Sequence, residues 1–84
     1  MKAEEMFNKL GYIEIANYHK SITYRFTNKQ HCEFTIVIEL EYKTYRMMYR
    51  DWKLHYPKHE YFHINLEEHK AITQQMKELG WLDD

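Results

Sequence analysis

The most specific chemical pattern in the chain is His59-Glu60-Tyr61-Phe62-His63, which matches H-E-x-x-H. In zinc proteases a helix places both histidines on one face as metal ligands, with the glutamate beside the metal-bound water. Here Pro57 lies just upstream, and residues 61–64 have the composition of an extended segment. In a strand, which rises about 3.3 Å per residue, His59 and His63 would lie about 13 Å apart and could not share one ion. We therefore predict no catalytic metal and no cofactor. If a metal is bound, His59 and His63 are its ligands.

The spacing of the histidines leaves one alternative open. His55, His59 and His63 follow one another at intervals of four, so two or three of them could bind a transition metal if the segment coiled. We interpret them instead as surface histidines on an irregular connection. His69 falls within the apolar stripe of a predicted helix, so we expect it to be partly buried with a hydrogen-bond partner.

A basic aromatic segment spans residues 42–53. Rings that stack on bases, alternating with cations that contact phosphates, are typical of proteins that bind single-stranded nucleic acid. In a strand the arginines would share one face with Met48, while Tyr45, Met47 and Tyr49 would face the core. This register avoids burying arginine, but it separates the charges from the rings. The residues that could bind nucleic acid are Tyr42, Lys43, Arg46, Arg50, Trp52 and Lys53.

Other catalytic patterns are missing from the sequence. Combinations of serine, histidine and aspartate can be drawn from any chain with six histidines, but we find no nucleophile elbow or paired-carboxylate motif. The two glycines, Gly11 and Gly80, both lie at predicted helix ends, so neither is available for a phosphate-binding loop. We predict that the protein is not an enzyme.

Two segments have helical periodicity. In the first, residues 2–10, Ala3, Met6, Phe7 and Leu10 form one apolar stripe, and Gly11 follows. The second, residues 66–79, begins after Asn65 and Glu68, which form a capping-box pattern, and it ends at Gly80. Its predicted apolar face consists of Leu66, His69, Ile72, Met76 and Leu79. We expect Tyr12 to fold back on Phe7, and Trp81 on Met76.

Between the helices the period changes to two, which is typical of half-buried strands. We predict strands over residues 12–16, 22–27, 32–40 and 44–49, and a further strand over residues 61–64. In the third strand the even-numbered positions should face the core, and Glu33, Thr35 and Glu39 should face outward. Short turns between the strands indicate a meander. The sequence therefore predicts a single α+β domain, residues 1–84, with a four- to five-stranded antiparallel meander and both helices packed on one face.

Composition limits where the protein works and what it binds. The chain has 84 residues, a net charge of −1 and one cysteine, so neither a second domain nor a general attraction to nucleic acid is expected. Cys32 starts an alternating apolar run, and we expect it to be a buried small residue. A small domain without disulfides suits a reducing compartment, and no segment resembles a signal peptide or a membrane helix. We expect a cytoplasmic protein without membrane contact.

The two ends of the chain resemble known proteins. Residues 3–12, AEEMFNKLGY, and residues 71–81, AITQQMKELGW, are similar to the opening and closing segments of many small uncharacterised proteins of phages and prophages of low-GC Gram-positive bacteria. The similarity covers about 20 of the 84 residues. It implies expression in the bacterial cytoplasm from a phage or prophage genome, and it implies no activity and no catalytic residues.

From these observations we expect a non-catalytic accessory or regulatory protein that acts through protein–protein contacts. A sheet face not covered by helices and an abundance of tyrosine both favour an interface. The partner would be another protein or a second copy of the chain in a homodimer. The alternatives are single-stranded nucleic-acid binding through the basic aromatic segment and metal-dependent hydrolysis at the H-E-x-x-H string.

Overall fold

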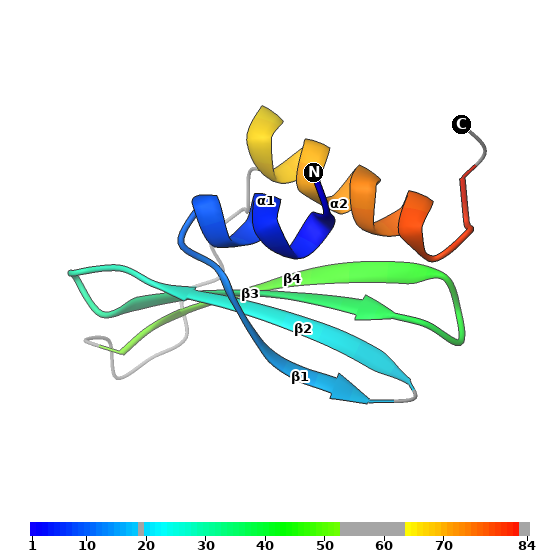
Figure 1. The fold of residues 1–84 in the computed structure, drawn as a ribbon. Helices are drawn as coiled ribbons and strands as arrows, with labels where there is room; N and C mark the ends of the chain where they lie inside the picture. Colours follow the sequence, from blue (N-terminus) through cyan, green and yellow to red (C-terminus); the bar gives the residue numbers. More distant parts are fainter. Residues whose placement is uncertain (19, 53–63, 83–84) are drawn as a thin grey trace.

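The protein has two layers, an antiparallel sheet and a pair of helices that cover one of its faces (Figure 1). The structure is a computed structural model that describes residues 1–18, 20–52 and 64–82. Strands pair in the order β1-β2-β3-β4. The elements are, in chain order, α1 (Ala3–Lys9), β1 (Ile13–Tyr18), β2 (Ser21–Thr27), β3 (Cys32–Glu39), β4 (Thr44–Asp51) and α2 (Leu66–Glu78).

This architecture confirms the predicted α+β meander with a helix at each end of the chain. Every predicted strand up to residue 49 is present, with bounds that differ by at most two residues at either end. The further strand predicted over residues 61–64 lies outside the described residues, apart from Ile64, which belongs to no strand.

Both helices end in the same hydrogen-bonded motif. Gly11 and Gly80 have φ values of 96° and 77°, in the left-handed region that favours glycine. The amide of Tyr12 donates to the Phe7 carbonyl (3.0 Å), and that of Trp81 donates to the Met76 carbonyl (2.9 Å). The glycine amides close the inner bond of each motif, to the carbonyls of residues 8 and 77. These two Schellman motifs confirm the helix ends predicted from the two glycines.

The start of α2 is fixed by a buried polar cluster. The Glu68 amide donates to Asn65 Oδ1 (2.7 Å), and the Asn65 amide donates to Glu68 Oε1 (3.0 Å), which completes the predicted capping box. The second oxygen of the Glu68 carboxylate accepts a hydrogen bond from the Tyr12 hydroxyl at 2.6 Å. One carboxylate therefore caps α2 and joins it to the segment that follows α1.

The apolar core lies between the helices and the covered face of the sheet. Phe7 of α1 stacks on Tyr24 of β2, with ring centroids 4.0 Å apart and planes 19° apart, and meets Tyr12 edge-on at 5.8 Å. The hydroxyl of Tyr24 donates to Gln75 Oε1 of α2 at 2.7 Å. Cys32 is buried, as predicted, and its sulfur accepts a hydrogen bond from the Tyr49 hydroxyl at 3.2 Å.

The buried face of α2 differs from the prediction. Leu66 and His69 were expected to face the core, but both are exposed, and Leu66 retains 65% of its accessible surface. The helix is rotated so that its buried residues are Glu68, Ala71, Ile72 and Gln75. The two tyrosine hydroxyls explain this rotation, because a carboxylate and an amide can be buried where a donor reaches them. The periodicity of apolar residues in the sequence carries no information about such hydrogen-bond partners.

The two buried tyrosines predict a loss of stability at alkaline pH. Burial, and then the hydrogen bond to Glu68, raise the pKa of Tyr12 above its ordinary value. Burial, and then the charges of Glu14, Glu4 and Glu78, raise the pKa of Tyr24. In the unfolded chain both phenols ionise near pH 10. Stability is therefore fully present below about pH 10 and falls above it, by up to about 1.4 kcal/mol per pH unit for each tyrosine.

Urea unfolding between about pH 8 and about pH 11 measures this loss. In the Tyr24→Phe variant, stability should fall less steeply with pH, because one of the two protonated phenols is gone. Tyr42→Phe, at an exposed position, is the matched control and should leave the slope unchanged. Equal slopes in wild type and Tyr24→Phe would contradict the interpretation.

Candidate functional site

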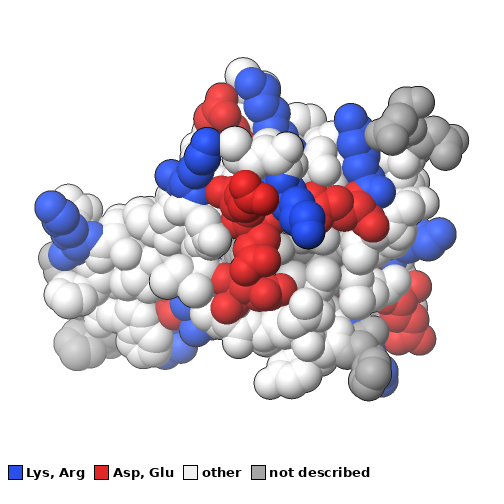
Figure 2. All heavy atoms as spheres, viewed as in Figure 1, with Lys and Arg blue, Asp and Glu red and all other residues white. Residues whose placement is uncertain are grey.

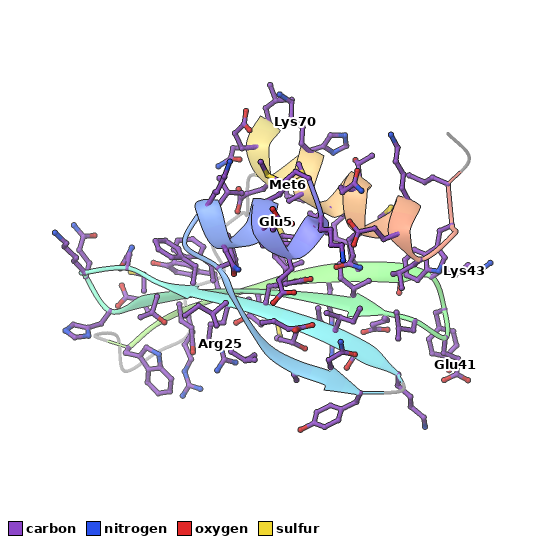
Figure 3. All side chains as sticks on the ribbon, in the orientation of Figure 1. Glu5, Met6, Arg25, Glu41, Lys43 and Lys70 are labelled. Atoms are coloured by element: carbon purple, nitrogen blue, oxygen red, sulfur yellow. The ribbon has the colours of Figure 1, made fainter. Side chains whose placement is uncertain are left out.

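The sheet has one face that the helices do not cover (Figure 1). Strand register assigns its residues, because paired residues share a face and successive residues alternate. Arg25 lies on this side of the sheet, opposite to Met6 and Lys70 on the helices (Figure 3). We call this surface the open face. It consists of Ile13, Ala16, Tyr18, Ser21, Thr23, Arg25, Thr27, Glu33, Thr35, Val37, Glu39, Thr44, Arg46, Met48 and Arg50.

The centre of the open face is already closely packed. Thr35 and Val37, on the inner strand β3, are only 4% and 7% exposed. Arg25 Nε donates to Thr35 Oγ1 at 3.2 Å, so the arginine side chain extends beside the threonine. Thr35 points away from the helices, as predicted, and it is buried among its neighbours on the open face. Two inner residues of this face are therefore shielded from solvent by their neighbours in the chain.

Large apolar side chains are exposed at both margins of the open face. On β1, Ile13 is 66% exposed and Tyr18 is 71% exposed, and on β4 Met48 is 44% exposed. Ile15 is also exposed, at a bulge where the β1–β2 register shifts between Glu14 and Ala16. Exposed apolar residues that share one face of a sheet are typical of a contact surface.

The charges of the open face are mostly paired. Arg25 Nε lies 2.9 Å from Glu33 Oε1, and Arg46 Nε lies 3.1 Å from Glu39 Oε1. Each pair joins an arginine on one strand to a glutamate on the neighbouring strand β3. Because both pairs are partly exposed, each adds little to stability. Their effect is to offset the positive charge of this face and to fix the orientation of the arginines.

Trp52 borders the open face beyond the end of β4. The guanidinium carbon of Arg50 lies 3.6 Å from the centroid of the indole ring, a cation–π contact. The indole nitrogen donates to Glu33 Oε2 at 3.3 Å. The tryptophan is 55% exposed, so this end of the face offers a large ring held in place by two neighbours.

The structure separates the residues predicted to bind nucleic acid. Tyr42 and Lys43 lie in the hairpin between β3 and β4, where Figure 3 shows Lys43 at the end of the sheet. Arg46 and Arg50 point to the open face, as predicted, and Trp52 lies beyond the other end of β4. The exposed rings of Tyr42 and Trp52 lie beyond opposite ends of β4, whose eight residues separate them by about 25 Å. Lys53 lies outside the described residues.

The predicted core-facing residues of β4 are only partly enclosed. Met47 and Tyr49 are half-buried on the helix side, whereas Tyr45, expected in the core, is 37% exposed. β4 is the last strand of the sheet as described, so its side chains lie at the margin of the helix layer. Its rings are therefore not available on the same face as its arginines.

The histidines of the H-E-x-x-H string do not enter the described structure. His55, His59, Glu60 and His63 all lie outside the described residues. Among residues 1–18, 20–52 and 64–82, no three histidine, cysteine or acidic side chains are grouped so that they could hold a metal ion.

Carboxylates gather on the helix side of the molecule, in the middle of the view in Figure 2. Glu4, Glu14 and Glu78 all lie close enough to Tyr24 to raise the pKa of its hydroxyl. Glu78 accepts hydrogen bonds from the Ala3 amide (2.6 Å) and from Gln74 (3.0 Å). A carboxylate at the first turn of α1 stabilises the helix terminus, so Glu78 has a structural role.

Sequence reasoning placed Arg46, Met48 and Arg50 on the outward face but did not identify the exposed Ile13 and Tyr18 of β1. Ile13 and Ile15 flank Glu14, an alternation that could have indicated an apolar side to this strand. The strand was instead predicted to begin at Tyr12.

None of the described helices is long and apolar enough to cross a membrane. Comparison with protein-family models, with curated proteins and with solved structures found no match.

Proposed function

We propose that this protein is a non-catalytic accessory or regulatory protein that binds another protein chain through its open face. The observation that carries the proposal is the exposure of Ile13 and Met48 on the sheet face that the helices leave uncovered, while the helices fill the opposite face. Leaving these two side chains in water contributes little to the stability of the sheet. Burying them against a partner is favourable by about 25 cal/mol per Å² of apolar surface.

The charge pattern supports a protein partner rather than a polyanion. Two of the three arginines of the open face are already paired with glutamates, so the face presents both signs of charge. Binding to phosphates would require a net positive surface and release of counterions. A face that presents both signs of charge beside exposed apolar side chains suits a protein partner, because complementary charges set the specificity of protein–protein interfaces. The similarity of the two end segments to phage and prophage proteins is the basis for proposing a phage or prophage setting.

Affinity purification from host lysate tests the proposal. A tagged wild-type chain, a tagged Ile13→Lys variant and a tagged Leu66→Lys variant are compared, with an untagged copy of the chain co-expressed. Leu66 is as exposed as Ile13 but lies on α2, which makes it the matched control. We expect captured protein, counting the untagged copy, to fall at least about 10-fold with Ile13→Lys and to stay unchanged with Leu66→Lys.

Two results would overturn the proposal. One is capture that Ile13→Lys leaves intact. The other is recovery of oligonucleotides in place of protein, with an affinity that falls steeply as salt rises, which would favour the single-strand binding alternative.

A further inference from the structure

We propose that the partner of the open face is the open face of a second copy, in a two-fold dimer whose axis runs along the strands between β2 and β3. This inference rests on the proposed function, since it uses the same surface. Most soluble oligomers are built from identical chains with closed symmetry, and a two-fold interface requires a surface that complements itself. The open face meets that requirement in the apolar residues at its two margins.

The face is better suited than the β1 edge of the sheet. Strand addition at β1 would need a regular row of backbone groups, but β1 has only six residues, and its pairing with β2 shifts at the bulge between Glu14 and Ala16. Bulges on short edge strands prevent such pairing. The exposed side chains of Ile13 and Tyr18 point out of the sheet, toward a partner that lies on it.

Strand register predicts which residues meet. Ile13, Arg25, Thr35 and Met48 form one row across the four strands, because each is paired with the next. Rotation about an axis parallel to the strands, between β2 and β3, brings β1 of one copy over β4 of the other. Ile13 then lies over Met48 of the second copy, and Met48 over Ile13. In the next row, Thr23 lies over Val37.

The charges select this axis over the other two-fold axis in the plane of the face. With the axis along the strands, Glu33 and Glu39 lie over the hydroxyl side chains of Thr27 and Ser21. An axis across the strands would place Glu33 over Glu39 twice in each dimer, and like charges directly opposite one another are destabilising. Facing sheets pack about 30° from parallel, so these pairs are nearest neighbours rather than exact overlays.

The size of the face predicts a weak dimer. Four strands spaced about 4.8 Å apart, six to eight residues long, present about 500 Å² per copy. Burial of about 1,000 Å² in total lies below the range of stable specific interfaces, which begins near 1,200 Å². We therefore expect a dissociation constant in the micromolar range, so that the dimer forms only at high local concentration.

Charge complementation tests the pairing. Ile13→Lys and Met48→Glu are each expected to weaken self-association at least about 10-fold, because each puts a charge against an apolar side chain in both halves of the dimer. In an equimolar mixture of the two variants, one contact becomes a lysine–glutamate pair and the other is the native isoleucine–methionine pair. The mixture should therefore associate at least about 10-fold more tightly than either variant alone.

Sedimentation equilibrium between about 5 µM and about 1 mM measures the association constants. The average mass of the wild type should rise from 10.6 kDa toward twice that value, and Leu66→Lys should behave as the wild type. Circular dichroism confirms that each variant is folded, which the exposure of all three positions favours. A wild type that stays at 10.6 kDa, or a mixture no tighter than its components, would overturn the dimer. If Ile13→Lys still abolishes capture of a different protein, the proposed function stands without the dimer.

Discussion

Replacing Phe7 with alanine is expected to lower the free energy of unfolding by about 3–5 kcal/mol. The side chain is completely buried and stacks on Tyr24, so truncation removes both its apolar area and an aromatic contact. The cavity would open between α1 and the sheet, where the helix has few other buried residues to compensate. For a domain of this size, the loss is comparable to a large part of the total stability.

Urea unfolding of wild type and Phe7→Ala measures this effect. Asn8→Ala, the adjacent exposed position on α1, is the control and should change stability by less than about 0.5 kcal/mol. The stability of Phe7→Leu should lie between those of Phe7→Ala and Asn8→Ala, because leucine retains most of the buried apolar area. If Phe7→Ala lost less than about 1.5 kcal/mol, α1 would not be packed on the sheet as described.

Replacing Gly11 with alanine is expected to cost more than the same change at Gly80, although both glycines have positive φ. The left-handed conformation itself costs about 1–2 kcal/mol for alanine at either position. At Gly11 the added carbon would lie 2.7 Å from Phe26 Cδ2, whereas at Gly80 it would meet nothing within 4 Å. Tyr12 and Phe34 flank the Phe26 ring, which limits how far the ring can move away from the added carbon. We expect a loss of about 2–4 kcal/mol for Gly11→Ala and about 1–2 kcal/mol for Gly80→Ala.

The comparison separates backbone strain from close packing. Both variants are measured by urea unfolding under the same conditions, and Gly80→Ala serves as the control for the conformational cost alone. Equal losses at the two sites would mean that the Phe26 ring moves aside without cost, and that the chain between α1 and β1 is packed less tightly than the structure shows.

Local chemistry made most of the fold predictable. Each helix end combined a glycine with a following aromatic residue, and the start of α2 combined Asn65 with Glu68, so two signals agreed at each boundary. The alternation in residues 32–40 fixed which residues of β3 face the helices. Where sequence period and end signals reinforce each other, the bounds of an element follow from the sequence.

Tertiary partners explain what the sequence did not show. The burial of Glu68 and Gln75 depends on hydroxyls 56 and 51 residues away, so the rotation of α2, with His69 and Leu66 exposed, was not predictable from an apolar stripe. The burial of Thr35 depends on Arg25 lying beside it. Both cases involve a polar group that is buried because a partner satisfies it.

The candidate site was only partly predictable for a related reason. The outward orientation of Arg46 and Arg50 followed from the alternation of β4 and from the cost of burying a charge. Their partners did not, because Glu39 on β3 and Trp52 beyond β4 become neighbours only through strand pairing. That Tyr18 shares a face with Ile13 depends on the register shift between Glu14 and Ala16, which no residue preference in that strand announces.

The alignment of Ile13 and Met48 on one row also has no local signature. The two residues are 35 positions apart, and they share a row only because three successive strand pairs are in register. This is the feature on which the proposed contact depends. It places one exposed apolar side chain at each margin of the open face, on the same row.

Concentration-dependent methyl NMR of the unmodified chain tests most directly whether the open face makes the contacts. The methyl signals of Ile13, Ile15 and Met48 should shift progressively as the protein is concentrated from about 10 µM to about 1 mM, because their surroundings change from water to protein. The methyl signals of Leu66 and Leu82, exposed on and beyond α2, should stay in place. Fixed signals for Ile13 and Met48 throughout, or shifts confined to α2, would contradict self-association through the open face.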